Sequence, residues 1–305
     1  MSFPVRIIAV LFLLLCQACS HIPLQAGRVG RHKFAFADGG TARYFVLDKP
    51  SDAVLPPSTY LFMIPGSDCG SMDGVLPGYF DGLDGRAGAI RIFILHKRFI
   101  GADAQGSCSA EFIRADHPER WLADQEEFIR AELSAARVND QPPERIVIVG
   151  MSEGAEIAPL LAKRIPGVTH VALLANGGMD PFDTYRLQMQ RHGFHQAVAD
   201  IERACALPSD EMVVSERTCR YWQELRTLRH ADNLLALDTP VFIAMGEEDT
   251  LVPIESAWFI REKFTTAGKK NLHLLTVPGT GHDFLREGKS ALPYLWDALE
   301  QWLQK

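Results

Sequence analysis

Short apolar runs alternate with amphipathic segments along most of the chain. The strand-length runs are residues 59–64, 89–95, 145–149, 170–174, 241–245 and 272–277. Apolar residues recur at helical spacing in the segments 119–137, 153–164, 254–264 and 291–303. Buried strands separated by helices indicate an α/β fold with a mostly parallel sheet and helices on both faces.

Two segments depart from this alternation. Residues 32–37 and 41–47 flank Asp38-Gly39-Gly40 and predict a β-hairpin. Residues 180–237 show helical periodicity without a buried strand, which predicts a helical cap inserted at the carboxyl edge of the sheet. With no internal repeat or interdomain linker, we expect one domain over residues 32–305 that carries this cap.

The first residues have the pattern of an export signal. Arg6 precedes an apolar run over residues 7–15, and about 14 Å of helix is too short to span a bilayer. The run ends before Ala18-Cys19, which resembles a bacterial lipobox with Cys19 as the lipidated residue. Residues 1–19 are therefore predicted to be a signal peptide and residues 20–31 a tether in a periplasmic, membrane-anchored protein. Ordinary cleavage nearby, giving a soluble periplasmic protein, is the alternative.

Cysteine usage agrees with export. Setting aside Cys16 and Cys19 leaves four of the six cysteines, an even number that suggests two disulfides in an oxidising compartment. Three pairings are open, and we favour Cys69–Cys108 and Cys205–Cys219 because each pair stays within one structural region. Metal binding is the alternative, although no pair has C-x-x-C spacing.

Charge and motifs exclude several function classes. The chain has 305 residues, with 31 Lys and Arg against 38 Asp and Glu, and a net charge of −7. A mildly acidic protein lacks the basic surface that nucleic-acid phosphates require, so we expect no nucleic-acid partner. The glycine-rich motifs of dinucleotide and nucleotide sites are also missing from the sequence.

The segment from Gly150 to Gly154 (GMSEG) lies directly between an expected buried strand and an expected helix. A serine on so sharp a turn needs glycines beside it, because there is no room for neighbouring Cβ atoms. The turn would project the hydroxyl of Ser152 from the sheet edge, where it would act as a nucleophile.

A serine nucleophile needs a base and an orienting carboxylate, each after a later strand. Asp249 follows the expected strand 241–245 in the segment GEEDTLVP, and His282 follows the last strand in GTGHDF. Taken separately, Asp249 could mark a helix start and His282 could be a surface residue. Their order after Ser152 predicts a Ser-Asp-His triad instead.

An acyl-transfer site also needs hydrogen-bond donors for the oxyanion. We expect one from the backbone N–H of Glu153, which follows the nucleophile. The second is expected from the backbone N–H of Ser67, in the segment IPGSDCG after the strand 59–64. A plain turn is the alternative interpretation of Pro65-Gly66.

Other polar and aromatic residues are interpreted by their places in the expected helices. Asp116 and Glu119 flank the start of the expected helix 119–137 and are interpreted as a helix cap and a first-turn charge. Aromatic and apolar residues of the cap would either line an acyl pocket or form the cap's own core. They are Met179, Phe182, Tyr185, Leu187, Met189, Phe194, Met212, Tyr221, Trp222 and Leu225.

These motifs resemble the α/β-hydrolase superfamily over most of residues 33–305, closest to its dienelactone-hydrolase-like and prolyl-oligopeptidase-like branch. The resemblance implies a serine hydrolase that forms an acyl-enzyme at Ser152, with His282 as base and Asp249 as its partner, and no metal or organic cofactor. Pro65 stands where members often carry histidine, which weakens the assignment of the second oxyanion donor.

We therefore expect an enzyme that hydrolyses a small-molecule, acyl or peptidyl substrate, with ester bonds as the first candidate. A peptidase or amidase with the same triad is the alternative among enzymes. A non-catalytic envelope scaffold is the alternative from another class, and three intact triad positions argue against it. Fold alone does not fix the substrate, and the oligomeric state is not predicted.

Overall fold

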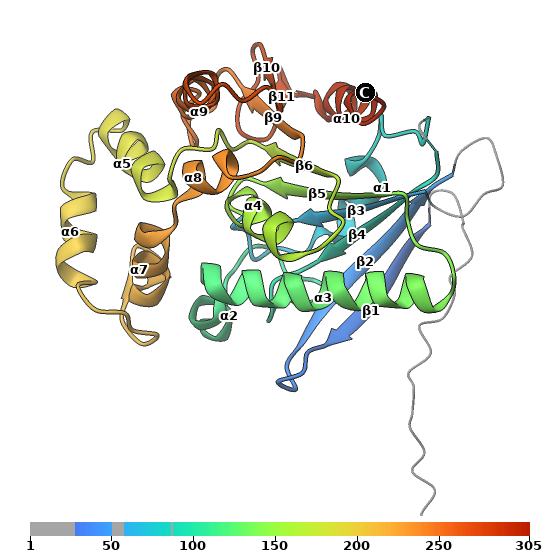
Figure 1. Ribbon diagram of the computed structural model, residues 1–305. Coiled ribbons are helices and arrows are strands. Elements are labelled where there is room, and N and C mark those ends of the chain that lie inside the picture. The colour runs from blue at the N-terminus through green and yellow to red at the C-terminus, as the bar shows by residue number, and fades with distance from the viewer. Residues whose placement is uncertain (1–27, 51–57, 87) are drawn as a thin grey trace, which may run out of the picture.

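The computed structural model describes residues 28–50, 58–86 and 88–305, which are built around an eight-stranded sheet (Figure 1). The strands, in spatial order, are β1 (Val29–Ala35), β2 (Thr41–Lys49), β4 (Ile90–Leu95), β3 (Thr59–Ile64), β5 (Arg145–Met151), β6 (His170–Leu174), β9 (Val241–Gly246) and β10 (Leu272–Val277). β2 pairs antiparallel with β1 and β4, and the other neighbours pair parallel. The predicted mostly parallel sheet is confirmed.

Successive residues of the central strands point into two different cores. In β3, Leu61 and Met63 belong to one core, and Phe62 and Ile64 belong to the other. A strand buried on both faces therefore appears in the sequence as a continuous apolar run. One face is covered by α3 (Pro118–Val138), α4 (Gly154–Arg164) and α9 (Glu255–Thr266), and the other by α1 (Leu76–Tyr79) and α10 (Leu292–Trp302).

The N-terminal hairpin differs from the prediction at both of its ends. β1 begins at Val29, inside the predicted tether 20–31, because Val29 pairs with Leu47 and so extends the ladder. β1 ends at Ala35, before the predicted end at residue 37, because Phe36 and Gly40 close a wide turn. The predicted signal peptide and Cys19 lie outside the described residues.

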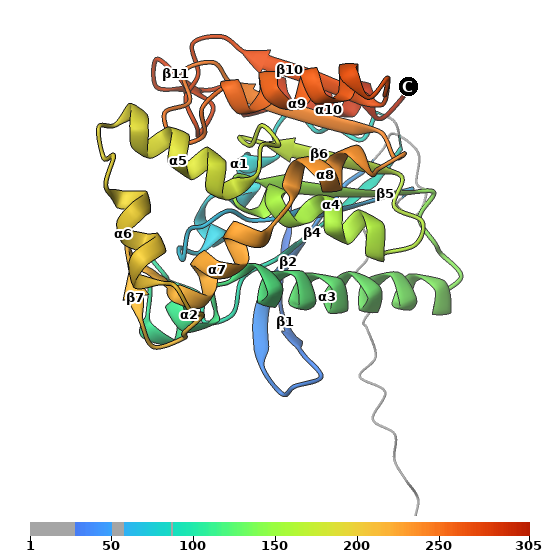
Figure 2. The ribbon, with the colours of Figure 1, turned by 60° about the vertical axis from the view of Figure 1, so that its left-hand side comes forward.

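The segment between β6 and β9 is largely helical and lies beyond one end of the sheet in both views (Figures 1 and 2). Its elements are α5 (Pro181–Arg191), α6 (Ala197–Ala204), β7 (Val213–Val214), β8 (Arg217–Thr218), α7 (Cys219–Thr227) and α8 (His230–Leu235). Side chains of α5 and α7 line the same cavity as Ser152, which follows the carboxyl end of β5. This arrangement places the segment at the edge of the sheet where a cap was expected.

Short elements complete the fold. They are α2 (Ala110–Ala115), the 3₁₀ helix Met72–Gly74 and the hairpin β11 (Leu285–Arg286) and β12 (Lys289–Ser290). α2 has no counterpart in the predictions, although Ser109 caps it by accepting a hydrogen bond from the Phe112 N–H at 3.1 Å. In the part of the chain that the structure describes, no helix is both long and apolar enough to cross a membrane.

Candidate active site

Ser152 lies on a sharp turn between β5 and α4 with φ of 51°, in the left-handed region that non-glycine residues rarely adopt. The two flanking glycines are required by close backbone packing. A Cβ on Gly150 would lie 2.3 Å from the Cα of Ala155, and a Cβ on Gly154 would lie 2.3 Å from the carbonyl oxygen of Ile64. The strained backbone, held by packing, is typical of functional positions.

The structure brings Ser152, His282 and Asp249 into one hydrogen-bonded chain. The Nε2 of His282 lies 2.9 Å from the Oγ of Ser152, and its Nδ1 lies 2.8 Å from the Oδ2 of Asp249. Asp249 is buried, and its Oδ1 accepts hydrogen bonds from the N–H groups of Leu251 at 2.9 Å and Val252 at 2.8 Å. These contacts fix the carboxylate, and through it one edge of the imidazole.

The two expected oxyanion donors border the serine. Glu153 precedes α4, and its backbone N–H makes no hydrogen bond to any other described residue. The loop after β3 passes close to the nucleophile, since a Cβ on Gly66 would lie 3.3 Å from the Cβ of Ser152. Ser67 follows Gly66 and lines the same cavity. Both N–H groups therefore belong to segments that adjoin the Ser152 hydroxyl.

Two disulfides pair the cysteines as the sequence favoured. Cys69 and Cys108 join the loop after β3 to the loop after β4, with Cα atoms 5.4 Å apart. Cys205 and Cys219 join the end of α6 to the start of α7, with Cα atoms 4.8 Å apart. One bond therefore restrains the loop that holds Ser67, and the other restrains the inserted segment.

A cavity of about 1260 Å³ opens over Ser152 and His282. Tyr185, Tyr221, Trp222 and Leu225 line it from the inserted segment. Of the two interpretations given to the cap's aromatic and apolar residues, lining a pocket applies to these four, and Tyr221, Trp222 and Leu225 belong to the buried core as well. Others have different places: Phe182 is buried in the core, whereas Phe194 and Met212 are exposed.

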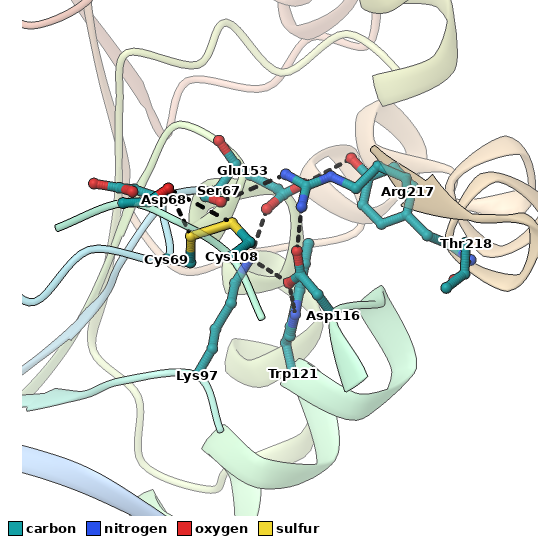
Figure 3. A network of polar contacts seen from close by, with 12 residues as sticks. Ser67, Asp68, Cys69, Lys97, Cys108, Asp116, Trp121, Glu153, Arg217 and Thr218 are labelled. Atoms are coloured by element: carbon teal, nitrogen blue, oxygen red, sulfur yellow. Dashed lines mark hydrogen bonds and ion pairs between the residues drawn. A yellow bond between two sulfur atoms is a disulfide. The ribbon is translucent and has the colours of Figure 1, made fainter. Parts of the chain in front are cut away.

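A buried group of charged side chains adjoins the nucleophile, and the sequence did not reveal it (Figure 3). The Nζ of Lys97 lies 2.8 Å from Asp116 Oδ1 and 2.7 Å from Glu153 Oε2, and 3.5 Å from the centroid of the Trp121 ring. Arg217 contacts Asp116 from the other side. One feature of the sequence could have indicated this group: Lys97 is a charged residue just after a buried strand.

The interpretation of Asp116 as a helix cap is wrong. Its carboxylate accepts a hydrogen bond from the Trp121 indole N–H at 2.7 Å and pairs with Lys97 and Arg217. His117 occupies the N-terminal cap position of α3 instead, without a side-chain capping bond. A carboxylate that faces two cations and an indole is better satisfied there than at a solvated helix end.

The positive charges of Lys97 and Arg217 balance the negative charges of Asp116 and Glu153. Burial opposes ionisation of Glu153, but the positive charges of Lys97 and Arg217 lower its pKa below the ordinary value. Burial raises the pKa of Asp116, whereas the same two cations favour its ionised form. Two cations thus face two carboxylates, and a third carboxyl group nearby has no cation of its own.

That third group is Glu156, in the first turn of α4. Its Oε2 is buried and has no hydrogen-bond partner among the described residues. Burial, followed by the negative charge of Glu153, raises the pKa of Glu156 well above its ordinary value. The folded protein therefore holds a proton on Glu156 at a pH where the unfolded chain has lost it.

Glu156→Gln is therefore expected to stabilise the protein near pH 8 by about 1–2 kcal/mol and to change little near pH 5. The contribution of Glu156 to stability falls as pH rises above the ordinary glutamate pKa, because its ionisation favours the unfolded chain. The neutral amide removes this loss. Urea unfolding at both pH values measures the difference, with the exposed Glu262→Gln as control. An equal effect of Glu156→Gln at both pH values would contradict the prediction.

No group of His, Cys, Asp or Glu side chains suited to a metal ion occurs in residues 28–50, 58–86 or 88–305. The side chains that the structure brings together at Ser152 are a hydroxyl, an imidazole and a carboxylate. In this geometry, the imidazole can accept the serine proton while the carboxylate balances the resulting charge.

Comparison with known proteins agrees with this fold. Residues 136–286 match the model of the BAAT / acyl-CoA thioester hydrolase C-terminal family. That segment runs from the end of α3 to β11 and includes Ser152, Asp249 and His282. Comparison with curated protein sequences gives no match.

Solved structures of similar fold include two proteins of about the same size and one larger protein. Est1E from Butyrivibrio proteoclasticus has a TM-score of 0.61 at 17% identity, with 90% of this chain and 97% of that chain covered. An esterase domain from Rhodothermus marinus has a TM-score of 0.56 at 16% identity, with 91% and 98% covered. The acylaminoacyl peptidase of Pyrococcus horikoshii has a TM-score of 0.60 at 11% identity, with 91% and 41% covered.

This chain and the three solved structures share one architecture. The parallel sheet, the strand–turn–helix at Ser152 and the later loops of Asp249 and His282 follow the order of that architecture. At these identities the solved structures show a common fold and leave the activity of this chain to be tested. The chain therefore has the α/β-hydrolase fold.

Proposed function

We propose that this protein is a serine hydrolase that cleaves ester bonds through an acyl-enzyme. The observation that carries the proposal is the hydrogen-bonded chain from Ser152 through His282 to the buried Asp249. His282 Nε2 takes the proton from the Ser152 hydroxyl as its oxygen attacks the carbonyl carbon. The same nitrogen then gives that proton to the departing alcohol.

The second half of the reaction repeats these steps with water. His282 deprotonates a water molecule that attacks the acyl carbon, and the proton returns to the Ser152 oxygen as the acid product leaves. The N–H groups of Glu153 and Ser67 would stabilise the negative charge on the carbonyl oxygen in both halves. Each such donor contributes about 3–4 kcal/mol to the barrier reduction in serine hydrolases.

The cavity supports an apolar acyl or alcohol group as the part of the substrate that is recognised. Tyr185, Tyr221, Trp222 and Leu225 contribute apolar and aromatic groups to the lining of the cavity that also contains Ser152. Est1E, one of the structural neighbours, is also known with ferulic acid bound, an aromatic carboxylic acid. We propose esters with an aromatic or medium-chain acyl group as the first substrates to test.

Labelling with a fluorophosphonate probe tests the proposal. Such a probe reacts with a serine whose base and oxyanion donors are already assembled, so we expect a single adduct on Ser152, located by mass spectrometry. Ser152→Ala should abolish labelling and lower ester hydrolysis by a factor of at least about 10⁴. Ser71→Ala, a second serine lining the cavity, is the control and should label normally. Absence of labelling in folded wild-type protein would favour a non-catalytic scaffold.

A peptidase or amidase is the second candidate, because acylaminoacyl peptidases are among the structural neighbours. Thioesters are a further option, because the matching family model includes acyl-CoA thioester hydrolases. Values of kcat/KM for p-nitrophenyl acyl esters, aminoacyl amides and acyl-CoA thioesters, measured on one preparation, would rank the three bond types.

We also propose that the enzyme works in the bacterial envelope, exported by residues 1–19 and anchored through lipid on Cys19. The apolar run before Ala18-Cys19 supports this proposal. The disulfides Cys69–Cys108 and Cys205–Cys219 suit the same oxidising compartment.

A further inference from the structure

The hairpin of β7 and β8 in the inserted segment has a strained turn. Val214 pairs with Arg217, so Ser215 and Glu216 form a two-residue turn, with φ of 48° and 63°. Such a turn favours Asn-Gly, because each non-glycine residue in this region costs about 1–2 kcal/mol. The strain is held at the rim of the cavity, which Ser215, Glu216 and Arg217 all line.

The strained turn directs Arg217 toward three elements of the active site (Figure 3). Its guanidinium donates to Asp116 Oδ2 and, through Nη2 at 3.4 Å, to the carbonyl oxygen of Ser67. The same Nη2 lies 3.9 Å from Glu153 Oε1. Arg217 is thus the residue of the inserted segment that contacts the residues of both expected oxyanion donors.

Tyr221 supports the same arrangement from α7. Its hydroxyl donates to Glu153 Oε1 at 2.6 Å, and its ring lies 5.0 Å from the guanidinium carbon of Arg217. The disulfide from Cys205 to Cys219 lies just beyond the hairpin and joins the start of α7 to the end of α6. The position of Arg217 is therefore fixed by covalent and polar contacts within the inserted segment.

The Ser67 loop is restrained at its other end by Cys69–Cys108. Ser67 lies between Gly66 and Cys69 in this loop. Its carbonyl oxygen accepts a hydrogen bond from the side chain of Arg217. The N–H and the carbonyl of Ser67 lie in two successive peptide planes that meet at its Cα. A hydrogen bond to the carbonyl therefore restrains the plane that adjoins the one carrying the N–H. A donor is effective only when it is held in place before the charge develops.

We propose that Arg217 is a positioning residue for the oxyanion hole, through which the inserted segment completes the active site. The inference rests on the proposed serine-hydrolase function and goes beyond it, because it assigns a role in turnover to the cap. Arg217 is not a substrate ligand in this proposal, since both of its terminal nitrogens already face protein acceptors: Nη1 faces Asp116, and Nη2 faces Glu153 and the Ser67 carbonyl. Its role is to hold the Ser67 N–H toward the carbonyl oxygen of the bound ester.

Arg217→Met tests the proposal, with Arg220→Met as its matched control. Arg220 lies on α7 and forms an exposed ion pair with Asp210, in which Nη2 is 3.0 Å from Oδ2. For a short p-nitrophenyl ester, Arg217→Met should lower kcat about 10- to 100-fold, with KM within about 3-fold. The fluorophosphonate labelling rate should fall in parallel, whereas Arg220→Met should change both by less than about 2-fold.

Chemical rescue separates positioning from a general loss of packing. Arg217 lines the cavity, so millimolar guanidinium should restore part of the kcat of Arg217→Ala, whereas equal ammonium should not. Arg217→Lys keeps the charge but loses the planar fork that reaches Asp116 and Ser67 together, so its kcat should also fall. If Arg217→Met does not fold, Arg217→Lys and the guanidinium titration supply the same comparison.

Several results would overturn the inference. An unchanged kcat in Arg217→Lys and Arg217→Met would show that the guanidinium does not position the loop. A rise in KM alone would make Arg217 a substrate-binding residue. Failure of the proposed function has a different signature, because Ser152 of the wild type would then remain unlabelled. Normal labelling of Ser152 in both wild type and Arg217→Met would reject this inference alone.

Discussion

Asp249→Asn is expected to lower kcat on the order of 10⁴-fold while the fold and KM stay nearly unchanged. The surroundings of Asp249 decide which way the new amide points. The N–H groups of Leu251 and Val252 donate to Oδ1, so the amide oxygen takes that position. The amide NH₂ then faces His282 Nδ1, where the carboxylate Oδ2 was.

An NH₂ donor at that position forces the wrong tautomer on His282. Nδ1 must become an acceptor, so Nε2 carries the hydrogen and points it at the Ser152 hydroxyl, which it can no longer deprotonate. Steady-state kinetics on a p-nitrophenyl ester measure the loss. Asp283→Asn is the matched control: Asp283 also lines the cavity and follows His282, but its Oδ1 accepts from the Leu285 N–H.

The two variants together decide whether Asp249 is the group that orients His282. The control should keep kcat within about 3-fold of the wild type, because the ring nitrogens of His282 face Asp249 and Ser152, whereas Asp283 accepts from the Leu285 N–H. A value for Asp249→Asn within tenfold of the wild type would show that another group orients His282. Glu248→Gln, at the residue directly before Asp249 in the same loop, would then be the first alternative to measure.

The hydrogen-bonded arrangement of Ser152, His282 and Asp249 could be predicted because each of the three residues has a local signature. Ser152 lies between a buried strand and a helix, flanked by glycines that the packing against Ile64 and Ala155 requires. Asp249 and His282 each follow an apolar strand, and parallel strands deliver their carboxyl ends to one edge. Each strand, turn and loop is encoded by a short segment. Their order along the chain can therefore be predicted from the sequence.

The buried charges could not be predicted for the opposite reason. Lys97, Asp116, Glu153 and Arg217 come from four different elements, and their contacts depend on how the inserted segment packs on the sheet. In the sequence each resembles an ordinary surface charge, since most Lys, Asp, Glu and Arg residues are solvated. The hairpin start at Val29 was missed because ladder length depends on pairing with Leu47, which no local pattern reports.

Lys97→Met should have the largest effect on stability, lowering the free energy of unfolding by about 3–5 kcal/mol. The side chain of Lys97 is 8% exposed, and its ammonium lies between Asp116 and Glu153 and over the Trp121 ring. Methionine fills a similar volume but leaves two buried carboxylates with one remaining cation, Arg217. The cost is that of unpaired buried charge, because the apolar stem of the side chain is largely replaced.

Urea unfolding measures this loss, with Lys163→Met as control. Lys163 lies in the last turn of α4, where its ammonium makes an exposed contact with Asn233 at 3.3 Å, so its replacement should cost less than about 0.5 kcal/mol. If Lys97→Met is too unstable to purify, Lys97→Arg, which keeps the charge, and the double variant described next still provide the comparison.

The double variant Lys97→Met/Glu153→Gln separates unpaired charge from lost packing. If uncompensated charge causes the loss, neutralising Glu153 should recover a large part of it, because Asp116 and Arg217 then form a balanced pair. If lost packing over Trp121 causes it, the second substitution should add a cost, since Tyr221 and Arg217 lose a charged partner. The sign of the interaction free energy between the two sites therefore decides whether unpaired charge or lost packing destabilises Lys97→Met.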